Sequence, residues 1–199
     1  MSKLLIITSN PEPDSLTNAA GAAVAQGAEE KGVQAEILDL YDVGFNPVYT
    51  LADREHYLGR APMPEDVLPI QQRIAQADAL VIVFPMYWFT MPAMVKGLFD
   101  RVICRGFAYS PDGTPGALAG KKVRLVMLMG GTESGIKELG VEAGLRAQIC
   151  SQTFGKYCDV SDVDFVYIED LTMGDDSEPC RQTAALQLEG MKRLGASLV

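Results

Sequence analysis

Five short apolar runs recur along this chain of 199 residues, separated by stretches whose apolar residues have helical spacing. Short apolar runs bounded by glycine, proline or asparagine are typical of buried strands. Regular alternation of strand and helix predicts an α/β protein with a mainly parallel sheet and helices on both faces. The predicted strands are Leu4–Ile7, Ala35–Leu40, Asp78–Phe84, Val123–Met129 and Val163–Ile168, and the predicted helices cover 17–31, 68–77, 92–104, 136–155 and 179–198.

Five strands favour the flavodoxin-like order 2-1-3-4-5, which gives a three-layer sandwich, over the six-stranded dinucleotide fold. No shift in composition marks a domain boundary, so we expect residues 1–199 to form one domain. One long irregular stretch, 41–69, contains Pro47, Pro62 and Pro64. Loops of that length inside compact domains are usually functional or pack on a partner.

Charge and composition exclude several classes of function. The formal net charge is -9 and no stretch is rich in lysine or arginine, which argues against nucleic-acid binding. No apolar run approaches the roughly 20 residues that span a membrane, and Met1–Leu4 lacks the layout of a signal peptide. We therefore expect a cytoplasmic protein without membrane insertion. The single histidine, His56, and four cysteines without CxxC spacing argue against a metal site and a Ser-His-Asp triad.

The ligand site of such a sheet lies beyond the carboxyl ends of its strands, at the switch point between strands one and three. The loop after Thr8 contains neither GxGxxG nor a Walker lysine. It does place Ser15, Thr17 and Asn18 at the start of a helix, where hydroxyls, free N–H groups and the helix dipole favour a phosphate. The alternative is that Ser15 or Thr17 only caps the helix.

Two further loops are candidates for contact with a flat heterocycle. After Phe84 the chain reads Pro85, Met86, Tyr87, Trp88 and Phe89, and three consecutive aromatic residues cannot all enter the core. The alternative is that one or two of the rings pack under the next helix. After Met129, Gly130, Gly131 and Thr132 leave room for close approach of a ligand, although Gly-Gly can also be a simple turn.

The segment 84–102, FPMYWFTMPAMVKGLFDRV, resembles the NAD(P)H quinone dehydrogenase family with a flavodoxin-like fold. That family reads F-P-x-x-W-F-x-x-P-A-x-x-K-G-x-x-D/E-R-V at this point. The likeness spans about residues 4–135 and includes DLY at 39–41, FNPV at 45–48, GFAY at 106–109, GKK at 120–122 and the Gly130-Gly131 turn.

The resemblance implies a flavin, FMN or FAD, with NADPH or NADH as electron donor. It implies that two electrons pass by hydride transfer to a quinone, nitro or azo compound, in a homodimer. Family members place a tyrosine and a histidine soon after the Gly-Gly turn, whereas 132–137 supplies neither, so no catalytic residue is assigned. The cofactor-binding residues that it implies are Asn10, Ser15, Thr17, Asn18, Pro85, Met86, Tyr87, Trp88, Phe89, Gly130, Gly131 and Thr132.

Two other functions fit the same fold. An electron carrier of the flavodoxin type would dock through an acidic surface, and the net charge is compatible with that role. A flavin-binding regulatory subunit of an ion-efflux system would keep the same site. Lys96, Asp100 and Arg101 fit helix scaffolding or a subunit contact better than catalysis. The stretch 41–69, which holds Tyr49, His56 and Tyr57, is a candidate for the dimer interface.

Overall fold

The five predicted strands form one parallel sheet in the order β2-β1-β3-β4-β5. The computed structural model describes residues 2–171 and 177–198 of the chain. This confirms the predicted fold class and strand order, and the strand boundaries differ from the predicted ones by only a residue or two. The strands are β1 (Lys3–Thr8), β2 (Gln34–Asp39), β3 (Ala79–Pro85), β4 (Lys122–Leu128) and β5 (Asp162–Ile168).

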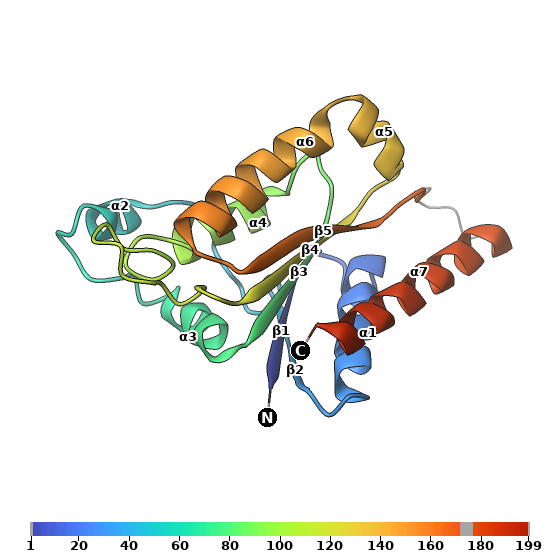
Figure 1. Cartoon of the computed structure of the whole chain (residues 1–199), viewed down its shortest axis with the longest axis horizontal. Helices are drawn as coiled ribbons and strands as arrows, with labels where there is room; N and C mark the ends of the chain where they lie inside the picture. The colour runs from blue at the N-terminus through green and yellow to red at the C-terminus, as the bar shows by residue number, and fades with distance from the viewer. Residues whose placement is uncertain (1, 172–176, 199) are drawn as a thin grey trace.

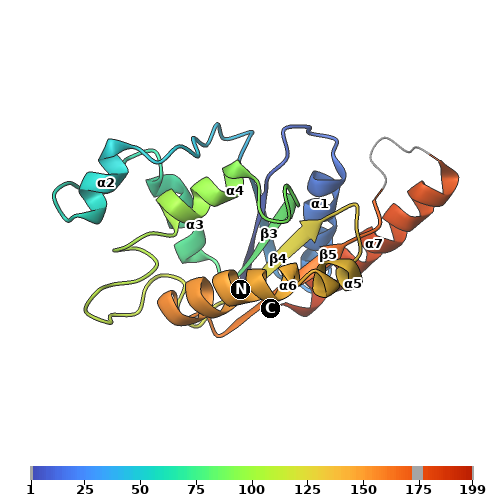
Figure 2. The ribbon, with the colours of Figure 1, turned by 90° about the horizontal axis from the view of Figure 1, so that it is seen from above.

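Helices cover both faces of the sheet (Figures 1 and 2). Helices α1 (Leu16–Glu29) and α7 (Glu178–Ser197) pack side by side on one face. The opposite face is covered by α3 (Leu68–Gln76), α4 (Ala93–Gly97) with the wide-turn π-helix η1 (Leu98–Val102), and α6 (Val141–Leu145) with the π-helix η2 (Arg146–Tyr157).

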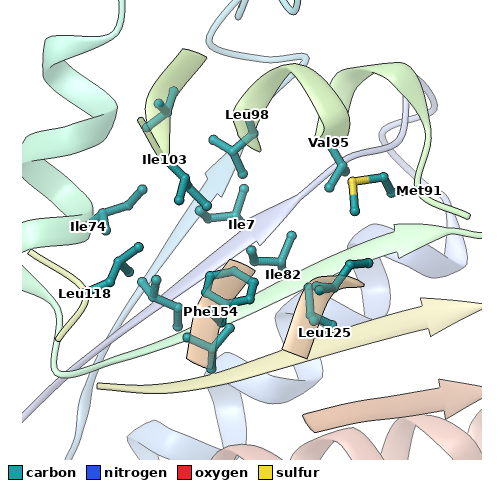
Figure 3. Close-up of a cluster of buried hydrophobic side chains, with 14 of the residues drawn as sticks. Ile7, Ile74, Ile82, Met91, Val95, Leu98, Ile103, Leu118, Leu125 and Phe154 are labelled. Carbon is teal, nitrogen blue, oxygen red and sulfur yellow. The ribbon is translucent and has the colours of Figure 1, made fainter. Parts of the chain in front are cut away.

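Alternation of side chains along each strand divides the core into two halves. Leu4 and Ile6 of β1 pack toward α1 and α7, while Leu5 and Ile7 pack into the larger cluster on the other face. Figure 3 shows Ile7 in this larger cluster, close to Ile82, Leu98 and Phe154. Burial of each such aliphatic side chain contributes about 1.5–3 kcal/mol to the stability of the folded state. Burial on both faces explains why these strands read as continuous apolar runs.

Two helices differ from the predicted ones in where they begin and in how regularly they continue. Pro92 is the N-cap of α4, not its first helical residue, and the helix widens into η1 at Leu98. The segment predicted as one helix over 136–155 begins earlier, with α5 (Glu133–Glu138), and is interrupted at Gly140. Gly140 has a φ of 72°, a conformation that glycine adopts without steric cost and that ends α5 before α6 begins.

The stretch 41–69, expected to be irregular throughout, contains the helix α2 (Leu51–Tyr57). The sequence did carry a signal for this helix. The Thr50 hydroxyl accepts from the Asp53 N–H group, and the Asp53 carboxylate accepts from the Thr50 N–H group, which together form a capping box. A helix of two turns leaves too short an apolar pattern to be recognised by periodicity alone.

Arg101 of η1 holds this stretch against the body of the protein. Its side chain is only 2% exposed, and its Nε atom lies 3.1 Å from Asp53 Oδ2. Its Nη1 atom donates to Asp66 Oδ2 at 2.8 Å and to the Asn46 carbonyl at 2.6 Å. Burial favours a raised pKa for Asp53, but hydrogen bonds from Thr50 and Arg101 outweigh it and hold the pKa below its usual value. Arg101 therefore has the scaffolding role expected from the sequence, and Lys96 pairs with Asp100 on the same helical segment.

Close packing of α1 on α7 depends on glycine at two positions. A methyl group at Gly27 would overlap the backbone carbonyl of Lys192, and one at Gly195 would overlap the carbonyl of Val24. The helix backbones approach so closely at these points that a side chain on either glycine would force them apart.

We therefore expect Gly27→Ala to lower the free energy of unfolding by about 1–3 kcal/mol, because it overpacks a rigid backbone contact. Gly144→Ala is the matched control, since a methyl group at this helical position meets no atom within 4 Å. It should raise stability by about 0.5–1 kcal/mol. Urea unfolding midpoints of the two variants measure both effects, and equal midpoints would contradict the packing argument.

Candidate functional site

The loops that follow β3 and β4 meet in one cavity at the carboxyl edge of the sheet. The cavity has a volume of about 270 Å³. Because β3 and β4 are parallel neighbours, their following loops emerge side by side. The structure thus brings together most of the residues predicted in these two loops. The cavity is lined by Met86, Trp88, Phe89, Met129, Gly130, Gly131 and Ile136.

A tight turn presents the aromatic residues of the first of these loops. Tyr87 and Thr90 exchange two backbone hydrogen bonds, of 2.9 and 3.1 Å. The two residues between them, Trp88 and Phe89, have φ values of 49° and 61°. Such a turn normally contains asparagine and glycine, because a larger side chain in this conformation costs about 1–3 kcal/mol. The Trp88 side chain is 94% exposed, so no burial in this chain offsets that cost.

The Gly-Gly loop is fixed in place by its neighbours. Asp170 donates a backbone hydrogen bond to the Gly131 carbonyl at 3.0 Å, and Thr132 caps α5 by accepting from Gly135 N–H at 3.2 Å. A methyl group on Gly131 would meet no atom within 4 Å and would project into open space beside the cavity. The loop is therefore a rigid wall that a flat ligand can approach closely.

The loop after β1 is tied together by its four predicted residues. Ser15 caps α1 by accepting from Asn18 N–H at 3.3 Å. Asn10 donates to the buried Thr17 hydroxyl at 3.1 Å. The Asn18 side chain donates to the carbonyls of Glu12 and Pro13, both at 3.2 Å. These bonds shape the loop but use up many of the groups expected to hold a phosphate.

Two buried hydroxyls beside this loop lack a partner. Thr8 and Ser9 are 1% and 2% exposed, and within the described chain neither hydroxyl has a hydrogen-bond partner. Orphaned buried hydroxyls are costly and call for an explanation. They lie at the end of β1, next to the N-terminus of α1, where an anion is favoured. The residues present therefore fit a phosphate. Neither residue was among the predicted ones, although both directly follow the first apolar run.

His56 lies in a different cavity, which α2 forms with η1. This cavity has a volume of about 400 Å³. The ring atoms Nδ1 and Nε2 of His56 lie 3.3 Å from the Ala61 carbonyl and 3.1 Å from the Arg105 carbonyl. The histidine therefore connects α2 to the segment after η1. The cavity is lined by Tyr49, Asp53, His56, Tyr57, Met63, Pro64, Phe99, Asp100, Arg101, Ile103, Cys104, Arg105 and Tyr109.

Thiol chemistry is disfavoured at three of the four cysteines, all of which are free. Burial raises the pKa of Cys104 and Cys150 to about 11 and that of Cys158 to about 12, so these thiols stay protonated at neutral pH. Over the described ranges 2–171 and 177–198, no group of three or more His, Cys, Asp or Glu side chains is arranged to hold a metal ion. Nor does any helix in those ranges have the length and apolarity to cross a membrane.

A five-stranded parallel sheet in the order 2-1-3-4-5, with helices on both faces (Figure 1), defines the class of flavodoxin-like folds. The family model described as flavodoxin-like fold matches residues 2–190, and the chain belongs to this family. This confirms the resemblance found in the sequence.

Similar proteins agree with this assignment. An NAD(P)H oxidoreductase of Escherichia coli, YcaK, is 33% identical over 178 residues, which cover 88% of each chain. The mouse ribosyldihydronicotinamide dehydrogenase [quinone] is 30% identical over 163 residues, covering 72% of this chain and 70% of that protein. The structure of an NAD(P)H:quinone oxidoreductase from Methanothermobacter marburgensis superposes with a TM-score of 0.87 at 27% identity, covering 99% of this chain and 96% of that one.

The strain in the aromatic turn leads to a stability prediction. The double variant Trp88→Asn with Phe89→Gly should raise the free energy of unfolding of the ligand-free protein by about 1 kcal/mol, because these residues suit a turn with positive φ. Trp88→Ala is the control, since alanine removes the ring but keeps the unfavourable conformation. Chemical denaturation compares the three proteins, and a double variant no more stable than Trp88→Ala would show that the turn is unstrained.

Proposed function

We propose that this protein is a flavin-dependent NAD(P)H oxidoreductase that passes two electrons from NADH or NADPH to a quinone or a similar nitro or azo acceptor. The observation that carries the proposal is the strained turn that exposes Trp88 beside the Gly130-Gly131 wall. An exposed indole in a costly backbone conformation is explained if it contacts a ligand. The names of the relatives given above support the same class of reaction.

In this proposal the flavin spans three loops, which follow β1, β3 and β4. The hydroxyls of Thr8 and Ser9, with the start of α1, hold its phosphate. The backbone of Pro85–Phe89 and the residues Gly130–Thr132 would hold its isoalloxazine ring. When bound, the flavin accepts a hydride from NAD(P)H and delivers electrons to the acceptor.

The residues of this chain then have the tasks of binding and orientation. The two hydrogen bonds of the turn leave the N–H groups of Trp88 and Phe89 unpaired with other backbone groups of the described residues. Fixed N–H dipoles of this kind favour negative charge on a neighbouring ring. None of the described residues that line the cavity in the β3 and β4 loops has an acidic or basic side chain.

We also propose a homodimer that associates through the segment 48–58. This segment exposes a row of large apolar side chains, and Leu51 is 74% exposed. Several large exposed apolar side chains within one short segment favour an interaction site. The apolar side chains of the segment are Val48, Tyr49, Leu51, Tyr57 and Leu58.

The free thiols support a location in a reducing compartment such as the cytoplasm.

The purified protein should show flavin absorbance bands that bleach on anaerobic addition of NADH or NADPH. Ser9→Ala should raise the flavin dissociation constant about tenfold, because one hydrogen bond to a charged phosphate is lost. Trp88→Ala should raise it about threefold to tenfold through the lost ring contact. Fluorescence titration of the flavin-free protein measures both constants.

Ser151→Ala and Leu186→Ala change exposed residues on η2 and α7 and serve as matched controls. Full flavin affinity in both Ser9→Ala and Trp88→Ala would place the site elsewhere. A bound flavin that neither nicotinamide reduces would favour the electron carrier. A protein that takes up neither FMN nor FAD would overturn the proposed function.

The dimer can be tested separately by light scattering coupled to size-exclusion chromatography. We expect Leu51→Glu to convert the protein to monomers, because it places a charge in the proposed apolar interface. Leu186→Glu introduces the same charge at an exposed leucine of α7 and should leave the dimer intact. Dissociation by Leu186→Glu alone would move the interface to the α1 and α7 face.

A further inference from the structure

Helix α5 forms part of the candidate flavin cavity, yet apolar packing holds it only weakly. The helix begins directly after the Gly130-Gly131 wall and Thr132, and it contributes Ile136 to the cavity lining. Of its six residues, all of which the structure describes, only Ile136 is buried. A helix this short is marginal without support from its surroundings. Polar contacts at its first residue therefore have a large effect on where this side of the cavity lies.

The carboxylate of Glu169 supplies such a contact. Glu169 directly follows β5, and its Oε2 atom accepts from the N–H group of Glu133, the first residue of α5, at 2.6 Å. Thr132 caps the helix by accepting from Gly135 N–H, so Glu169 satisfies a different N–H group at the same helix end. A hydrogen bond to a carboxylate is about twice as strong as one between neutral groups. Glu169 thus joins the end of β5 to the start of α5.

The backbone on either side of Glu169 is joined to the same loop. Met129 N–H donates to the Ile168 carbonyl at 2.9 Å, and Asp170 N–H donates to the Gly131 carbonyl at 3.0 Å. These two bonds fix the loop after β4 as far as Gly131. The Glu169 carboxylate extends the connection past Gly131 into α5, so the segment 168–170 holds both the wall and the helix that follows it.

Helix α7 holds Glu169 itself through a single side chain. Gln187 Oε1 accepts from the Glu169 N–H group, and Gln187 Nε2 donates to the Glu169 carbonyl, both at 2.8 Å. A neighbouring strand would exchange a similar pair of bonds with this residue, which lies just beyond the edge strand β5. Because both bonds go to the backbone of Glu169, they persist when its side chain is shortened.

We propose that Glu169 is a positioning residue for the isoalloxazine ring, which acts through α5 and the Gly130-Gly131 wall and is itself held by Gln187. The inference rests on the proposed function and deepens it. Contacts between a flat ring and a backbone wall weaken steeply when the wall moves by as little as about 1 Å. The carboxylate acts in this role as a hydrogen-bond acceptor, so an amide of the same length can replace it.

The test compares Glu169→Ala with Glu169→Gln by fluorescence titration of the full-length, flavin-free protein. The probes are FMN and riboflavin, which has the same ring system without the phosphate. Glu169→Ala should raise both dissociation constants by the same factor of about ten, because the contact that holds α5 is lost. Glu169→Gln keeps an acceptor oxygen at the same reach and should remain within about threefold of wild type. Ser9→Ala, in contrast, should weaken the binding of FMN alone.

Two further variants test whether the effect passes through Glu169. Gln187→Ala should weaken riboflavin binding in the same direction, and its effect should be less than additive with that of Glu169→Ala, because the two residues act in series. Glu138→Ala is the matched control and should bind both probes as wild type does. It removes the same charge from an exposed position on α5, at the end of the helix remote from the wall.

Nuclear magnetic resonance relaxation of the flavin-free protein tests the anchoring of α5 without any cofactor. In Glu169→Ala, the order parameters of the amides of 131–136 should fall from about 0.85, typical of rigid backbone, toward about 0.6. Those of the amides in β1 should stay near 0.85, and Glu169→Gln should restore the wild-type values throughout. A general loss of stability would not confine the change to this segment.

The proposal is overturned if Glu169→Ala changes neither dissociation constant by more than about twofold, or if it weakens FMN alone, which would place the effect at the phosphate. Equal losses in Glu169→Gln and Glu169→Ala would also overturn it, because they would show an effect of charge. In each of these cases wild type still binds FMN and the proposed function stands. A wild-type protein that takes up no FMN would overturn the proposed function together with the positioning of the ring, whereas the relaxation data would still establish Glu169 as the anchor of α5.

Discussion

Burial of the central strands on both faces is the constraint on which the rest of this structure depends. Alternate residues of β1 enter opposite halves of the core, so that helices must cover both faces of the sheet. Covering both faces of consecutive parallel strands requires helical crossovers, and these bring every strand back in the same direction. The loops after β1, β3 and β4 consequently emerge at one edge. The candidate site is therefore a consequence of how the core is built.

Several residues at that edge have unfavourable backbone conformations or unpartnered polar groups, and the buried core beside them stabilises the fold enough to offset the cost. Trp88 and Phe89 adopt a conformation suited to asparagine and glycine, and the hydroxyls of Thr8 and Ser9 are buried without partners. Both departures lie directly after fully buried strands, which hold the loop ends in place. Departures from local rules at rigid positions are expected at functional sites. The aromatic turn and the loop after β1 fit this description.

The flank formed by α2 is organised differently, by charge instead of by apolar packing. Arg101 joins Asp53, Asp66 and the Asn46 carbonyl, which come from three points of the stretch 41–69. Removing one partner of such a buried cluster leaves an uncompensated charge, so the cluster specifies one position for the stretch. It leaves the apolar side chains around Leu51 exposed, which is the basis of the proposed dimer interface.

The sequence by itself determined the fold class, the strand order and the loops that carry the site, because apolar periodicity follows directly from burial on both faces. It also identified the segment around Trp88 through its resemblance to a family. It did not reveal the positive φ values of Trp88 and Phe89, the break at Gly140 or the anchoring role of Asp53 toward Arg101. The lack of partners at the buried hydroxyls of Thr8 and Ser9 was equally hidden, since it depends on what packs around the end of β1. Periodicity reports which face of an element is buried, whereas contacts between loop ends depend on the arrangement of whole elements, and only the tertiary structure decides that arrangement.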